Sequence, residues 1–126
     1  MSLVLDASAL LALLHEEPGA KRVEQALNGA LVSAVNWAEV IQKSLRRQTD
    51  VSWMWAGFSE VGVIIEPFTP AQAELAAHLW EKTRRHGLSL ADRACLSLAM
   101  ERQAPVLTAD RAWAKLGLDV EIQQIR

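Results

Sequence analysis

The sequence contains a single cysteine, Cys95, and no large excess of charge of either sign. One cysteine cannot form a disulfide within the chain, and it excludes a zinc site built from several thiolates. The 13 basic and 15 acidic side chains give a formal net charge of −2, which provides no overall attraction for a polyanion. Any binding of nucleic acid must therefore depend on local basic patches or on bound metal.

Long hydrophobic runs are also missing. The longest nearly apolar stretch, Ala7 to Leu14, is far shorter than the roughly 20 residues that cross a bilayer. The N-terminus lacks the basic segment of a signal peptide and reaches Asp6 almost at once. These features predict a soluble, cytoplasmic protein without a membrane segment. The length of 126 residues suits one domain over residues 1–126.

Short apolar segments alternate with longer segments of helical periodicity. Strands are predicted over residues 2–6, 30–35, 63–65, 106–108 and 120–125. Helices are predicted over residues 7–14, 20–27, 36–47, 50–61, 69–86, 89–103 and 111–116. Strands separated by helices favour right-handed crossovers and a parallel sheet covered on both faces. The predicted fold is therefore α/β, a three-layer α/β/α sandwich around a mostly parallel sheet.

Four acidic residues occupy corresponding places in this pattern. Asp6 and Asp110 each follow a predicted strand and precede a helix. Glu39 and Asp92 lie in the first turns of predicted helices. Taken singly, each acid can be explained as a helix cap, because Asp6 and Asp110 suit N-caps and the other two complete variants of the capping box, with Asn36 and with Ser89.

Taken together, the four acids favour a metal site. The carboxyl ends of parallel strands lie along one edge of a sheet, where ligands bind. Four ionised carboxylates in one crevice repel one another, so they require raised pKa values or a cation. The histidines His15, His78 and His86 are scattered along the chain and form no ligand pair. Because carboxylate oxygens suit Mg²⁺ or Mn²⁺, an all-oxygen site is expected.

Four motifs carry a resemblance to a known family. They are Val-Leu-Asp-Ala-Ser-Ala at 4–9, Asn36-x-x-Glu39, Gly-Leu-Ser-Leu-Ala-Asp at 87–92 and Val-Leu-Thr-Ala-Asp-Arg-Ala-Trp at 106–113. In this order and spacing the chain resembles the PIN domain, and more closely the VapC-type toxins of prokaryotic toxin–antitoxin pairs. The resemblance implies a ribonuclease that binds Mg²⁺ or Mn²⁺ through Asp6, Glu39, Asp92 and Asp110. It also implies an RNA substrate, a cognate antitoxin whose tail enters the active-site groove, and a homodimer.

The implied reaction is hydrolysis of an RNA phosphodiester bond. Bound metal polarises a phosphoryl oxygen and lowers the pKa of a water that attacks in line. Asp6 and Asp92 are the expected direct ligands. Glu39 and Asp110 are each expected either to bind metal or to orient the water.

Three polar residues are predicted to hold the ligands in place. Ser8 and Thr108 match hydroxyl residues that family members carry beside the first and last acids. Asn36 precedes Glu39 by three residues. For Ser8 and Thr108, local hydrogen bonding to the backbone is the simpler alternative.

Basic residues near the acids are candidates for contacts with RNA. The two groups are Lys43, Arg46 and Arg47, and Lys82, Arg84 and Arg85. Members of the first group follow Glu39 by 4, 7 and 8 residues, so they share one helix face. This face extends about 12 Å away from Glu39. Ordinary solvated helix faces are the alternative explanation for both groups.

The aromatic residues and Cys95 are assigned to the core or to a partner surface. Residues 51–61 carry Trp53, Trp55 and Phe58 on more than one helical face, which indicates core packing and in part a partner surface. The tryptophans Trp37, Trp80 and Trp113 are predicted to lie in the core. Cys95, within an apolar helix, is predicted to be buried.

Other functions stay open at this level. A housekeeping PIN-type nuclease for RNA processing or repair would show the same motifs. An aspartyl-phosphate phosphatase or receiver domain also places an acid after its first strand, but it usually needs a second acid nearby or a catalytic lysine, and neither accompanies Asp6 or Thr108. A non-catalytic binding module would use the acids only as helix caps, and direct metal titration distinguishes that case.

Overall fold

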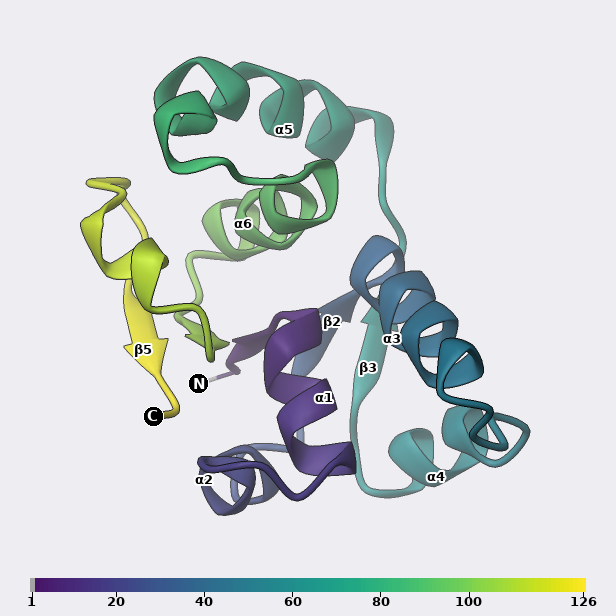
Figure 1. Cartoon of the computed structure of the whole chain (residues 1–126). Helices are drawn as coiled ribbons and strands as arrows, with labels where there is room; N and C mark the ends of the chain where they lie inside the picture. Colours follow the sequence, from purple (N-terminus) through teal and green to yellow (C-terminus); the bar gives the residue numbers. More distant parts are fainter. Residues whose placement is uncertain (1) are drawn as a thin grey trace.

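The computed structural model describes residues 2–126 and shows a sheet with helices on both faces (Figure 1). Five strands, all paired in parallel, follow the order β3-β2-β1-β4-β5. Their bounds are β1 Val4–Leu5, β2 Leu31–Ser33, β3 Ile64–Glu66, β4 Val106–Thr108 and β5 Ile122–Gln124. The predicted three-layer α/β/α architecture with a parallel sheet is confirmed.

The helices connect successive strands. Their bounds are α1 Ala7–Leu14, α2 Ala20–Glu24, α3 Ala34–Arg46, α4 Met54–Glu60, α5 Pro70–Thr83 and α6 Leu90–Arg102, with short 3₁₀ helices η1 Arg84–His86 and η2 Arg111–Lys115. Within residues 2–126, none of these helices combines the length and the hydrophobicity that a membrane crossing requires.

Each face of the sheet has its own hydrophobic core. Leu5 and Leu107 pack with residues of α1 to α4, whereas Val4 and Val106 pack with residues of α5 and α6. Successive side chains of a strand point to opposite faces. The central strands β1, β2 and β4 are buried at every position, which explains their short apolar sequence runs.

Helix α3 begins two residues earlier than predicted. Ser33 is its N-cap, with an extended backbone and a side-chain Oγ that accepts a hydrogen bond from the Val35 amide at 3.2 Å. Asn36 lies inside the helix, so the predicted capping box between Asn36 and Glu39 is wrong. The physical reason is that the serine at the end of β2 offers a hydroxyl cap before Asn36 is reached.

Helix α5 is capped by Thr69, but without a capping box. Thr69 Oγ1 accepts a hydrogen bond from the Gln72 amide at 3.1 Å. The Gln72 side chain does not return to the cap; it is buried and donates to Glu101 on α6 at 2.9 Å. Packing between α5 and α6 thus gives Gln72 a partner that competes with the local motif.

The tryptophans differ in burial. Trp113 is 1% exposed, which confirms its place in the core. Trp37 is half-buried and makes edge contacts with Trp55 and Phe58. Trp80 is 49% exposed, so its predicted core position is wrong. Helix α5 buries only the stripe Gln72, Ala76, Leu79 and Thr83, and Trp80 falls beside this stripe.

Candidate active site

The candidate site lies where the two central strands end. β1 and β4 pair in parallel with Leu5 opposite Leu107. The next residues along the two strands, Asp6 and Thr108, are therefore neighbours at the carboxyl edge of the sheet. This edge is where open parallel sheets bind ligands.

Asp6 is a buried carboxylate held by three hydrogen bonds. Its Oδ1 accepts from Ser8 Oγ at 2.7 Å and from the Ala9 amide at 2.9 Å, and its Oδ2 accepts from Thr108 Oγ1 at 2.6 Å. Only 4% of the residue is exposed. Burial raises the pKa of Asp6 to about 6, although these hydrogen bonds lower it and Asp92 raises it slightly further. Asp6 is thus an N-cap, as predicted, and its ionised form is disfavoured by burial.

Ser8 and Thr108 connect this carboxylate to the loop after β4. Ser8 Oγ accepts from the Ala109 amide at 2.9 Å, and Thr108 Oγ1 accepts from the Asp110 amide at 3.0 Å. Each hydroxyl therefore donates to Asp6 and accepts from the backbone. Ser8 and Thr108 therefore both hold the acid Asp6 and make local hydrogen bonds to the backbone, which were the two alternatives. Together they fix the position of Asp110 relative to Asp6.

Asp92 and Asp110 lie at the starts of two helices. Asp92 Oδ2 accepts from the Ser89 amide at 3.0 Å, while Ser89 Oγ accepts from the Asp92 amide at 3.1 Å, which is the predicted capping box. Asp110 caps η2 through Oδ1 and the Ala112 amide at 3.0 Å. Burial raises the pKa of Asp92, and the charges of Glu39 and Asp110 raise it further. The acids therefore interact electrostatically across the site.

Glu39 projects from α3, which packs against α6. Its Oε2 lies 3.0 Å from Lys43 Nζ. The two helices are joined by Asn36, whose Nδ2 donates to the backbone carbonyl of Ala91 at 3.0 Å. Asn36 Oδ1 is buried and has no hydrogen-bond partner within residues 2–126. Asn36 therefore connects the helix of Glu39 to the residue that precedes Asp92.

The donor chemistry of these acids fits a hard divalent cation. One oxygen each of Asp92, Asp110 and Glu39 is engaged by a cap or by Lys43, and in residues 2–126 the other receives no hydrogen bond. As the side chains stand, however, no three acidic, histidine or cysteine groups in this part of the chain are close enough to share an ion. The four-acid ligand set stays a prediction.

Two residues near the acids were not predicted as part of the site. Cys95 lies one helical turn after Asp92, is fully buried as predicted, and has its thiol pKa raised well above the ordinary value by burial and then by Asp6 and Asp92. It is therefore a neutral packing residue. Gln124 in β5 donates from Nε2 to the backbone carbonyl of Asp110 at 3.1 Å, a contact for which the sequence carries no signal.

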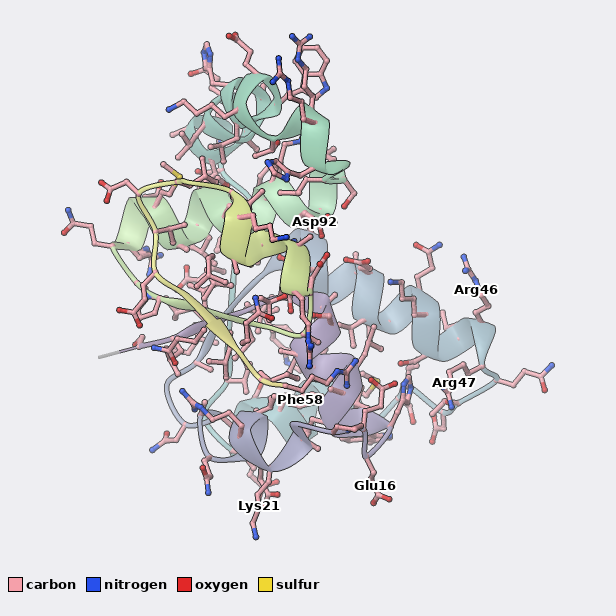
Figure 2. The ribbon with its side chains drawn as sticks, turned by 60° about the vertical axis from the view of Figure 1, so that its left-hand side comes forward. Glu16, Lys21, Arg46, Arg47, Phe58 and Asp92 are labelled. Carbon is pink, nitrogen blue, oxygen red and sulfur yellow. The ribbon has the colours of Figure 1, made fainter. Side chains whose placement is uncertain are left out.

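The predicted basic residues occupy two separate places. Lys43, Arg46 and Arg47 lie along α3, and Figure 2 shows Arg46 and Arg47 at the end of that helix distant from Asp92. Arg84 and Arg85 lie exposed on η1, where the Arg84 guanidinium is 5.3 Å from the centre of the Trp80 ring.

Removing the Asn36 side chain is expected to disturb the site without unfolding the protein. In Asn36→Ala, the Ala91 carbonyl loses its side-chain donor, and this hydrogen bond between α3 and α6 is lost while the two helices still pack together. Because such supporting contacts typically contribute about 10- to 100-fold to metal affinity or activity, Mn²⁺ affinity measured by calorimetry should fall by about that factor. Gln42→Ala, at an exposed position of the same helix, is the matched control. Unchanged Mn²⁺ affinity in Asn36→Ala would contradict the positioning role.

Comparisons with known proteins agree with the fold. The PIN domain family model matches residues 3–118, and no curated protein matches the sequence closely enough to show a relationship. Among solved structures, a toxin–antitoxin complex from Klebsiella pneumoniae is similar with a TM-score of 0.75 and 19% identity, over 95% of this chain and 99% of that one.

Two further structures are similar in fold. DNA-bound VapBC from Salmonella typhimurium has a TM-score of 0.73 and 14% identity, over 100% of this chain and 99% of that one. Mycobacterium tuberculosis VapC20, a Sarcin-Ricin loop cleaving toxin, has a TM-score of 0.70 and 17% identity, over 94% and 98%. The family model covers most of the chain, and the predicted resemblance is confirmed: the chain belongs to the PIN domain family.

Proposed function

We propose that this protein is a metal-dependent endoribonuclease and the toxin of a toxin–antitoxin pair. The observation that carries the proposal is the buried carboxylate of Asp6, whose pKa is raised by burial. The Thr108 hydroxyl joins this carboxylate to the backbone of Asp110. Burial raises the pKa of Asp92, and the charge of Glu39 raises it further. The similar toxin structures support the biological role, and VapC20 supports RNA as the substrate.

Each residue of the site has a part in this chemistry. Mg²⁺ or Mn²⁺, held by Asp6 and Asp92 together with Glu39 and Asp110, would supply a Lewis acid for the phosphoryl oxygen and an activated water. Ser8 and Thr108 hold the Asp6 carboxylate in one orientation through the bonds at 2.7 and 2.6 Å. The N-terminus of α1, which donates the Ala9 amide to Asp6, favours the ionised acid.

The proposal includes protein partners. Trp53 and Trp55 are 47% and 60% exposed on and beside α4, and exposed aromatic residues are typical of protein contacts. An antitoxin that covers this cytoplasmic toxin, and a second copy of the chain in a homodimer, are the proposed partners. The antitoxin complexes among the similar structures support the first of these.

Incubation of the purified protein with RNA tests the activity. We expect internal cleavage in the presence of Mg²⁺ or Mn²⁺ and none in EDTA, because unneutralised carboxylates repel the phosphate. Mapping of product ends by primer extension distinguishes internal cleavage from digestion at the termini. Cleavage that persists in EDTA, or no cleavage of any RNA with either metal, would contradict the proposed activity.

A further inference from the structure

A basic hollow of about 350 Å³ adjoins the candidate active site. It lies between one face of α1, the C-terminal half of α3 and Arg126. The charged residues in its wall are Lys43, Arg46, Arg47, Arg126 and Glu17. Four cations and one acid give a formal charge of +3 with His15 neutral, in a chain whose formal net charge is −2. Positive charge is thus concentrated at this place.

The hollow is continuous with the acid site through Ser8. This residue lines the hollow, and its Oγ donates to Asp6 Oδ1 at 2.7 Å. Lys43, at the same side of α3, pairs with Glu39 at 3.0 Å. The side chain of Ser8 therefore lies between the hollow and Asp6.

The cations are held in place but keep donors available. Arg126 Nη1 donates to Glu17 Oε1 at 3.1 Å and to the Pro18 carbonyl at 3.0 Å. Both contacts use one nitrogen, and a guanidinium has five N–H donors, so Nη2 and Nε stay available. Arg47 Nη1 lies 3.1 Å from Nδ1 of the half-buried His15. This contact orients Arg47 without neutralising it.

The spacing of the cations favours an extended polyanion over a single phosphate. Lys43 and Arg47 are four residues apart at the end of α3, which corresponds to about 6 Å along the helix axis. Arg126, from the end of the chain, lines the same hollow. Arg46 and Arg47 form no ion pair with an acid in residues 2–126. The aromatic side chains that would stack on bases do not line the hollow.

We propose that this hollow binds backbone phosphates of the RNA strand next to the scissile bond. The inference rests on the proposed function and adds the contacts that select long RNA over a dinucleotide. Because phosphate contacts carry no sequence information, the hollow raises affinity for every RNA that extends into it.

The test measures RNA binding separately from cleavage. In an Asp6→Asn background with Mg²⁺, binding of a fluorescent, mixed-sequence single-stranded RNA is measured by anisotropy at several salt concentrations. Arg47→Ala/Arg126→Ala should weaken binding by about tenfold or more. The slope of log K against log salt should become shallower by about 0.7 for each lost phosphate contact. Arg46→Ala, which removes no ion pair within the described chain, should act in the same direction.

Lys21→Ala is the matched control, because Lys21 is exposed on α2 and points away from Asp92 and α3 in Figure 2. In the active protein, the arginine variants should raise KM for the long RNA, and the ratio of kcat/KM for the long RNA to kcat/KM for a dinucleotide should fall. Affinity equal to that of the Lys21→Ala control would overturn the proposal. So would variants that lose binding of an acidic antitoxin peptide but keep RNA affinity. Persistent cleavage by Asp6→Asn would instead refute the proposed function, and the binding comparison would still stand.

Discussion

Asp6→Asn should reduce metal-dependent RNA cleavage by roughly a thousandfold or more. The variant removes one negative charge from the acid cluster but keeps the shape of the side chain. Asparagine Oδ1 can still accept from Ser8 and Ala9, and its Nδ2 can donate to Thr108 Oγ1. The fold should therefore be retained, and the loss should appear in kcat measured at saturating RNA and Mn²⁺.

Asp119→Asn provides the control for this experiment. Asp119 is exposed and lies in the turn before β5, outside the acid cluster, so this variant should cleave like the original protein. A circular dichroism spectrum and a melting temperature for both variants establish that they are folded. If Asp6→Asn cleaves within a few fold of the original protein, Asp6 does not hold the metal.

The same substitution should make the metal-free protein more stable at neutral pH. The pKa of Asp6 is raised from 3.8 to about 6 in the folded protein, mainly by burial. Below about pH 4 the acid is protonated in both the folded and the unfolded state. Between about pH 4 and 6 only the folded state retains the proton, so rising pH favours unfolding. Above pH 6 the cost is constant at about 3 kcal/mol.

Urea denaturation in EDTA at pH 4, 5, 6 and 7 measures this effect. The free energy of unfolding of Asp6→Asn relative to the original protein should rise by about 3 kcal/mol across this range. The difference between variants isolates Asp6, because Asp92, whose pKa is raised in the same direction, is present in both. Addition of Mn²⁺ at pH 7 should stabilise the original protein and have little effect on the variant. A difference that does not change with pH would contradict the assigned burial cost.

Local signals were sufficient for much of the fold. The sequence identified three helix caps from their side chains and positions, and each accepts the expected backbone hydrogen bond: Asp6, Ser89 and Asp110. Helix α1 has the predicted bounds because an N-cap and the pair Pro18–Gly19 limit an apolar run. The placement of the acids after strands predicted their common edge, since parallel strands end together.

Contacts between distant segments could not be predicted in this way. Asn36 was expected to cap its own helix, yet its side chain bonds Ala91, 55 residues away. Trp80 is large and apolar, as core residues are, but it lies beside the buried stripe of α5 and is exposed. Arg126 meets the hollow beside Ser8 only because β5 ends there.

The sequence by itself determined the type and order of the helices and strands, which side chains are apolar at the right period, and that four acids lie after strands or in helices. These properties depend on neighbours within a few residues. Tertiary structure alone decided which acid is buried deeply enough to have its pKa raised to about 6, and which cations line the same hollow. Burial and charge interactions depend on how the helices pack across the sheet, and residue spacing along the chain does not encode that packing.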